Sequence, residues 1–176
     1  GKIEIIVQDA PINSFTINIR IPSWSKNVNL LINDKNVETK PGYYASINRL
    51  WEKGDIINLE IPLKTELVYS NRNVEQNINQ VAIVRGPIVY CLEELDIEED
   101  VNLDDIYIPR DFSPDNFFKN DLLGGITILQ GKALKYTGES YDNELYNRSS
   151  VFKTEFTNIT MIPYFAWHNR GNHKMS

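Results

Sequence analysis

The side chains that could carry acid–base chemistry are concentrated in one acidic stretch, residues 93–105, where eight of thirteen positions are Asp or Glu. A glycosidase needs two carboxyl groups about 5 to 9.5 Å apart across one cleft, one of them with a raised pKa. On an extended backbone Glu93 and Glu94 point to opposite faces, whereas Glu94 and Asp96 share a face at roughly 7 Å. Because a pair inside such a charge run stays solvated, we interpret the stretch as a solvated connection. A calcium site is the alternative, although the Asp-x-Asp-x-Asp-Gly spacing of calcium loops is absent.

The sequence offers few groups for nucleophilic or metal chemistry. A catalytic cysteine needs an electropositive and partly exposed setting. Cys91 instead lies between Tyr90 and Leu92 in an apolar run, which predicts a buried, inert thiol. His168 and His173 are too few for a zinc site without a companion cysteine. Motifs for a nucleophilic serine, a phosphate loop or a dinucleotide are also absent, so we predict no catalytic residue, no cofactor and no metal ligand in this chain.

Aromatic side chains offer a third kind of chemistry, the stacking of sugar rings on flat faces. The candidates for sugar contact are Trp24, Tyr43, Tyr44, Trp51 and Trp167. The alternative is that these side chains fill the core and rim of a β-sandwich, as most aromatic residues there do. Tyr43 and Tyr44 are adjacent, so on a strand they face opposite sides and at least one is expected in the core.

Composition narrows the classes of fold and partner. A chain of 176 residues with 41% hydrophobic residues can bury a sizeable core. Its net charge of −6 and pI of about 5.0 give no positive field for a phosphate backbone, so no nucleic acid partner is expected. No apolar stretch reaches the roughly 18 residues needed to cross a bilayer, so no membrane partner is expected. The single cysteine excludes an internal disulfide and leaves the cellular compartment open.

Alternating apolar residues predict short strands along the first half of the chain. Residues 2–8 and 15–21 place apolar side chains at every second position, which is typical of half-buried strands. Turn formers at residues 33–36 predict a hairpin between residues 28–32 and 37–39. Residues 43–47 and 56–61 are expected to pair through the Gly54-Asp55 step. Residues 64–69 and 74–78 are weaker strand candidates.

The densest apolar run, residues 81–92, is interrupted by Arg85-Gly86-Pro87. Glycine permits unusual backbone angles and proline removes a ladder donor, so we expect one long strand that bends there and contributes to two sheets. The alternative is two short strands joined by a turn. Either arrangement places Cys91 among packed neighbours.

The remaining segments complete an all-β pattern. Residues 111–123 predict an irregular excursion with one helical turn, and residues 126–129 and 132–136 a hairpin about Gln130-Gly131. A polar loop at residues 138–150 and strands at 151–156 and 159–167 follow. This pattern predicts an all-β, antiparallel β-sandwich of jelly-roll-like type, with two small sandwiches in tandem.

Four motifs follow one another along the chain. They are Arg20-Ile-Pro-Ser-Trp24; Pro41-Gly42-Tyr43-Tyr44 with Trp51-Glu-Lys-Gly54-Asp55; the run from Val81 to Tyr90 around Arg85-Gly86-Pro87; and Ile162-Pro-Tyr-Phe-Ala-Trp167 with Asn169-Arg170-Gly171. Together they resemble the C-terminal half of glycoside hydrolase family 127, the β-L-arabinofuranosidase-like enzymes of bacteria. The resemblance covers nearly the whole chain. It implies that residues 1–79 belong to the middle β-sandwich domain and residues 80–176 to the C-terminal one.

In that family, as the resemblance implies, an (α/α)6 barrel performs a retaining hydrolysis with a zinc-held cysteine and a glutamate acid/base, and β-sandwich domains pack against it. Cys91 does not lie in the family's ligand motif, so neither nucleophile nor zinc is carried over to it. We expect a chain clipped at both ends, a non-catalytic accessory fragment whose partner is the missing barrel. An unpaired edge strand would be sticky, so a homodimer is a further expectation. The alternative function is a carbohydrate-binding module that uses exposed aromatic residues.

Overall fold

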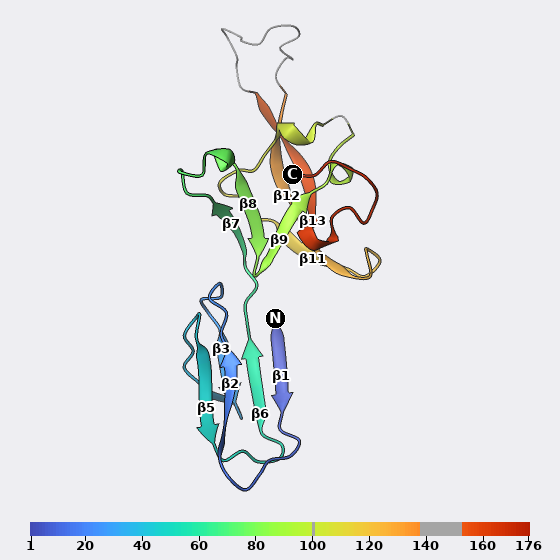
Figure 1. The fold of residues 1–176 in the computed structure, drawn as a ribbon. Helices are drawn as coiled ribbons and strands as arrows, with labels where there is room; N and C mark the ends of the chain where they lie inside the picture. The colour runs from blue at the N-terminus through green and yellow to red at the C-terminus, as the bar shows by residue number, and fades with distance from the viewer. Residues whose placement is uncertain (100, 138–152) are drawn as a thin grey trace. The chain divides into compact units, whose positions relative to one another are not determined.

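The structure, a computed structural model, describes residues 1–99, 101–137 and 153–176, which form two compact units, Gly1–Lys64 and Thr65–Ser176 (Figure 1). All paired strands are antiparallel, which confirms the all-β expectation. The elements of the first unit are β1 (Lys2–Ile6), β2 (Phe15–Arg20), β3 (Asn29–Ile32), β4 (Lys35–Asn36), β5 (Tyr44–Arg49) and β6 (Ile56–Glu60). Those of the second are β7 (Thr65–Tyr69), η1 (Glu75–Asn77), β8 (Val81–Arg85), β9 (Ile88–Leu92), η2 (Glu94–Asp96), η3 (Leu103–Asp105), β10 (Ile106–Tyr107), β11 (Asp115–Lys119), β12 (Ile126–Tyr136), β13 (Thr154–Pro163) and η4 (Tyr164–Ala166), where η marks a 3₁₀ turn.

The division between the units lies between Lys64 and Thr65, earlier than the division after residue 79 expected from the sequence. The reason is strand pairing, because β7 pairs with β8 and places Leu67 opposite Ile83. β7 is therefore the first strand of the second unit. Residues 74–78, a weak strand candidate, contain the turn η1 instead.

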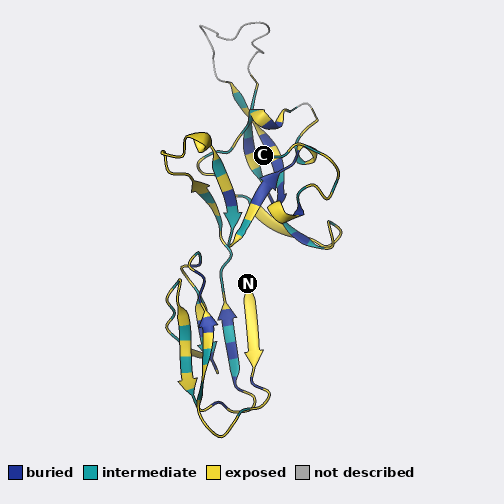
Figure 2. Ribbon diagram, viewed as in Figure 1, coloured by how far each residue is buried: buried dark blue, intermediate teal, exposed yellow. Residues whose placement is uncertain are grey.

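The first unit is a sandwich of a four-stranded sheet in the order β1-β6-β3-β4 and a two-stranded sheet of β2 and β5. Alternate residues of both sheets point into one core, as the period of a strand requires. The buried members of this core are Val7, Ile19, Ile21, Leu30, Ile32, Trp51, Ile57 and Leu59. Figure 2 shows β6 and β3 largely buried and β1 exposed along its length, so the expected half-burial of residues 2–8 is wrong for β1.

The predicted hairpin at residues 28–39 is confirmed, with a tight turn between β3 and β4. Asn33 and Asp34 have φ of +46° and +61°, which is the type I′ geometry that matches strand twist. The expected pairing of residues 43–47 with 56–61 is wrong. β5 pairs with β2, and β6 lies between β1 and β3, so the connection that holds Trp51 crosses from one sheet to the other.

The second unit is a seven-stranded sheet in the order β10-β12-β13-β9-β8-β7, with β11 also paired to β12. β12 pairs with β13 on one edge and with β11 and then β10 on the other. Its alternate residues enter two different cores, with Leu129 and Ala133 in one and Ile126 and Ile128 in the other. The sheet therefore carries apolar cores on both faces.

The run at residues 81–92 forms a hairpin of β8 and β9, so the bent-strand interpretation is wrong and the two-strand alternative holds. Gly86 has φ of +62° and Pro87 fixes a negative φ, which together give the two-residue turn of type II′ that favours hairpins. Arg85 and Ile88 are the last facing pair before this turn.

The expected hairpin about Gln130-Gly131 is also wrong, because β12 runs through both residues without a turn. Gly131 is required by close packing: a Cβ there would lie 2.7 Å from Cε2 of Phe112 and 3.2 Å from Cβ of Pro114. Residues 111–123 contain the strand β11 in place of a helical turn. The predicted loop at 138–150 and the start of the strand at 151–156 lie outside the described residues.

Candidate functional site

The five predicted sugar-contact residues are divided between the two units. Trp24, Tyr43, Tyr44 and Trp51 belong to the first unit and Trp167 to the second. Trp24 is half-buried, and both tyrosines are exposed. The expectation that one of the two tyrosines lies in the core is wrong, because Tyr43 precedes β5 in a turn whose Gly42 has φ of +86°.

Trp51 is a core residue, with 2% of its surface exposed, so its ring is not available to a sugar. Its indole N–H donates to the Phe15 carbonyl at 3.1 Å, and the Arg49 guanidinium lies 5.1 Å from its ring centre. Asp55, at the end of the same connection, accepts from the Glu52 N–H at 2.9 Å and pairs with Arg49 at 3.5 Å. This hydrogen bond, with others, holds the pKa of Asp55 below its ordinary range. Trp51, Arg49 and Asp55 therefore hold in place the connection that crosses from one sheet to the other.

Tyr44 lies at one end of a polar face on the two-stranded sheet. Its partner across the strands is Arg20, followed by Ser46 opposite Asn18. The Ser46 hydroxyl donates to Asn18 Oδ1 at 2.7 Å. Next to Tyr44, the Lys40 ammonium lies 4.2 Å from the ring centre of Tyr43. An exposed aromatic ring beside preordered hydroxyl and amide groups can make the contacts that a sugar requires.

Trp167 packs against the core that holds Cys91 and Ile162, so it is only half exposed. Its ring stacks on Tyr164 with 5.9 Å between centroids. Its indole nitrogen is buried, and no hydrogen-bond partner lies within reach among the described residues. Trp167 is therefore mainly a packing residue.

The acidic stretch is in large part the solvated connection that the sequence predicted, since Glu94, Glu98, Glu99 and Asp104 are exposed, but Glu93 is buried. The Glu93 side chain is 1% exposed and bound on both oxygens. Arg170 Nε donates to Glu93 Oε2 at 2.8 Å, Arg170 Nη1 donates to Asp96 Oδ1 at 2.9 Å, and Nη2 contacts both carboxylates. The His168 N–H donates to Glu93 Oε1 at 3.0 Å. We call Glu93, Asp96, Arg170 and the His168 amide the Arg170 clamp, and it fastens the C-terminal segment to the end of β9.

Cys91 is buried, as predicted. Burial, and then the nearby Glu93 and Asp96 carboxylates, raise its pKa to about 11, so at neutral pH it is a thiol and not the thiolate that attacks a substrate. No group of three or more His, Cys, Asp or Glu side chains that could hold a metal ion occurs in the described part of the chain. Among the same residues, no helical segment has the length and apolar character to span a bilayer.

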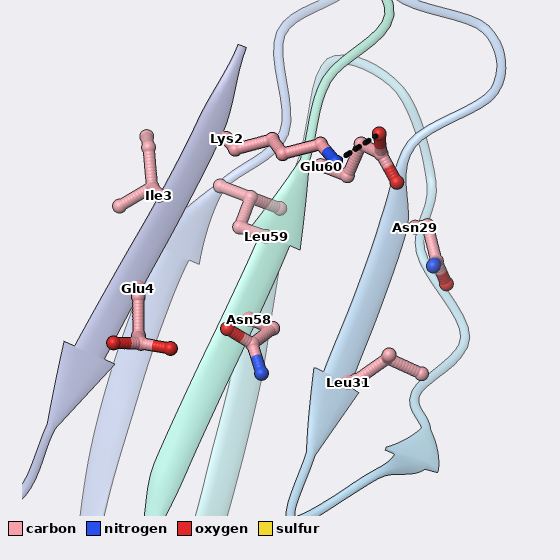
Figure 3. Close-up of a pocket in the computed structure, with 8 residues that line it drawn as sticks. All are labelled: Lys2, Ile3, Glu4, Asn29, Leu31, Asn58, Leu59 and Glu60. Atoms are coloured by element: carbon pink, nitrogen blue, oxygen red, sulfur yellow. Dashed lines mark ion pairs between the residues drawn. The ribbon is translucent and has the colours of Figure 1, made fainter.

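A shallow groove of about 410 Å³ lies on the four-stranded sheet of the first unit (Figure 3). Three neighbouring strands line it, with Lys2, Ile3 and Glu4 from β1, Asn58, Leu59 and Glu60 from β6, and Asn29 and Leu31 from β3. Lys2 Nζ lies 3.7 Å from Glu60 Oε1, and Figure 3 shows this pair at one end. Amide, carboxylate and ammonium groups can bind a polar ligand or another polypeptide, but none of the eight lining residues is aromatic.

Sequence reasoning missed both the groove and the Arg170 clamp. The groove leaves a signal, since its polar residues recur at every second position of β1 and β6. The alternation indicates a groove only when the pairing of β1, β6 and β3 is known. The sequence instead predicts that residues 56–61 pair with residues 43–47, which hides the groove. The clamp joins residues 77 positions apart in the chain, so no local pattern indicates it.

Comparison with known proteins covers both units. Residues 1–63 match the GH127 middle domain of β-L-arabinofuranosidases, and residues 65–176 match the glycoside hydrolase family 127 C-terminal domain. A non-reducing end β-L-arabinofuranosidase of Bifidobacterium longum subsp. longum is 30% identical over 97% of this chain, which spans 27% of that protein.

Two solved structures have the same fold over nearly the whole chain. A glycoside hydrolase matches with a TM-score of 0.91 and 34% identity over 100% of this chain and 29% of its own. A GH127 β-L-arabinofuranosidase from Geobacillus stearothermophilus T6 matches with a TM-score of 0.87 and 35% identity over 99% of this chain and 28% of its own. The chain thus spans less than a third of each relative, and its two units correspond to two successive domains. It belongs to glycoside hydrolase family 127, as that family's middle and C-terminal domains.

Proposed function

We propose that the chain is the non-catalytic accessory part of a longer bacterial β-L-arabinofuranosidase-like hydrolase. One observation carries the proposal: two accessory-domain matches account for residues 1–63 and 65–176, while the relatives are more than three times as long. Hydrolysis then belongs to an (α/α)6 barrel elsewhere in the parent protein, which also holds the zinc. The two β-units support that barrel and are its partner.

The chemistry of the buried carboxylates supports an accessory role. A general acid must hold a proton at working pH, so its pKa must be raised. The pKa of Asp55 is instead lowered by its hydrogen bonds. Glu93 and Asp96 share the Arg170 guanidinium, so oxygens of both carboxylates are already held by it and are not free to act on a sugar.

The test is hydrolysis of para-nitrophenyl β-L-arabinofuranoside with added zinc. We expect turnover by the full-length parent and none by the 176-residue chain at the same concentration. Turnover by the 176-residue chain would overturn the proposal. The supporting role has its own test in the parent protein, where Arg170→Met should lower the temperature at which activity is lost, whereas Lys174→Met should leave it nearly unchanged.

A second candidate function, binding of carbohydrate without hydrolysis, is favoured by the polar face around Tyr44. Its exposed ring lies opposite Arg20 and beside the hydrogen-bonded pair of Ser46 and Asn18. Titration calorimetry with arabinose-containing oligosaccharides tests it. Tyr44→Ala should abolish binding and Tyr69→Ala, an equally exposed tyrosine of the second unit, should not. Absence of binding by the unaltered chain would reject this function and leave the accessory role untouched.

A further inference from the structure

A second pocket, of about 420 Å³, lies in the second unit at the connection between β7 and β8. The connection, residues 70–80, contains η1 and supplies most of the lining, and residues that follow β10 supply the rest (Figure 1). β7 and β10 stand at opposite ends of the strand order. Leu67 of β7 and Ile106 of β10 pack against the same core, so the sheet brings its two ends together beside this pocket.

The charge of the pocket is opposite to that of the whole chain. Its lining includes Arg72 and Arg110 and no acidic side chain, although the chain has 24 acidic and 18 basic residues. Both arginines are exposed, and no carboxylate of the described residues forms an ion pair with either of them. A guanidinium binds a carboxylate through two parallel N–H bonds. The pocket therefore offers two groups that can bind an anion.

The uncharged lining suits a ligand that carries hydroxyl groups. Asn77, Asn79 and Gln80 contribute carboxamides, which both donate and accept hydrogen bonds. Within the described ranges, none of these three side chains is hydrogen-bonded to another residue. Tyr69, which is 58% exposed, adds an aromatic ring. Amides match the hydroxyl groups of a sugar, and the ring matches its C–H face.

Short-range hydrogen bonds hold the connection in shape without using those side chains. The Val74 N–H donates to the Asn71 carbonyl at 2.9 Å, and the Gln80 N–H donates to the Asn77 carbonyl at 3.1 Å. Asn79 between them has φ of +63°, which asparagine tolerates better than most residues. A loop that is already ordered loses less conformational entropy when a ligand binds.

We propose that this pocket binds an acidic sugar, a uronate residue of a glycan. Its carboxylate contacts Arg72 and Arg110, its hydroxyl groups contact the carboxamides, and one face of its ring lies on Tyr69. Inorganic phosphate would use the guanidinium groups alone, and a neutral sugar would leave them without a partner. An acidic peptide would pair with the arginines but has no ring of hydroxyl groups for the carboxamides. The site depends neither on the accessory role nor on the polar face around Tyr44, which belongs to the first unit.

Titration calorimetry of the 176-residue chain with tri-galacturonate, beside its uncharged methyl ester, tests the proposal. We expect the acid to bind and the ester not to bind, with affinity for the acid falling as salt screens the charges. Arg72→Gln and Arg110→Gln should each weaken binding by about tenfold or more, because each removes charge-assisted hydrogen bonds. Arg72→Lys should retain part of the affinity. The matched control is Lys119→Gln, which removes an exposed charge of the same unit outside the pocket and should bind like the unaltered chain.

Two further controls separate this site from the polar face around Tyr44. Tyr44→Ala should leave the affinity for tri-galacturonate unchanged. Neutral arabinose-containing oligosaccharides carry no carboxylate, so they should not displace tri-galacturonate. Circular dichroism verifies that each variant is folded, as expected because Arg72 and Arg110 are exposed.

Several results would overturn the proposal. They are absence of tri-galacturonate binding, equal affinity for the methyl ester, and unchanged affinity in both arginine-to-glutamine variants. Displacement of tri-galacturonate by inorganic phosphate at the same concentration would show a general anion site instead. Binding of hexaglutamate without binding of tri-galacturonate would assign the pocket to an acidic polypeptide segment.

Discussion

Arg170→Met tests the Arg170 clamp as the interaction that holds the C-terminal segment of the second unit. The guanidinium contacts both the Glu93 and Asp96 carboxylates, and the side chain of Glu93 is 1% exposed. Methionine keeps most of the length and apolar volume of the arginine stem but removes the charge. Glu93 would then keep only the hydrogen bond from the His168 N–H. An uncompensated carboxylate would remain buried.

Removing one partner of a buried ion pair costs about 3–5 kcal/mol. The Arg170 side chain is 18% exposed, so water reaches the site and the lower value of about 3 kcal/mol is the better expectation.

The assay is urea unfolding combined with hydrogen exchange at the backbone amides of Leu92, Glu94 and Ser176, which bond the end of β9 to the last residues of the chain. The matched control is Lys174→Met in the same segment. Its ion pair with Asp104 is exposed and should contribute only about 0–1 kcal/mol. An Arg170→Met variant that unfolds at the same urea concentration as Lys174→Met would refute the reasoning.

Three further predictions concern single positions. Gly131→Ala should lower the free energy of unfolding by about 1–3 kcal/mol, since the new Cβ would overlap the Phe112 ring, and a thermal melt followed by far-UV circular dichroism measures it. Trp51→Phe should cost about 1–3 kcal/mol in calorimetry, because it leaves the Phe15 carbonyl without its indole donor. Burial raises the pKa of Cys91 to about 11, whereas an unfolded cysteine ionises near pH 8.5. Stability should therefore fall as pH rises from about 8.5 to about 11, and this part of the pH dependence should be absent from Cys91→Ala.

The sequence correctly predicts those features that depend only on a residue and its neighbours along the chain. The turn at Asn33-Asp34 was readable because these residue types tolerate positive φ, and the structure has positive φ at both. Burial of Cys91 followed from its apolar neighbours. The all-β class followed from alternation over many short segments. None of these predictions required knowledge of which strands are neighbours.

Two of the errors arose because one residue type serves two physical purposes. Glycine at position 86 makes a turn with positive φ, whereas glycine at position 131 makes space for the Phe112 ring within a continuous strand. Each glycine interrupts a longer run of apolar residues, so the two cases look alike before the fold is known. Interpreting the first as a bend and the second as a turn was wrong in both cases for this reason.

The acidic stretch shows why charge density alone does not indicate chemistry. Glu93 lies among many acidic neighbours, yet it is buried because Arg170 approaches from far along the chain. A catalytic carboxylate must change its protonation state or bond to a substrate during each turnover. The groups that donate hydrogen bonds to it must therefore be able to release it. Glu93 and Asp96 share one guanidinium, and Glu93 also accepts a backbone N–H. These contacts tie the end of β9 to the C-terminal segment, and the same contacts leave the two carboxylates poorly placed to act on a substrate, which agrees with the accessory role that we propose.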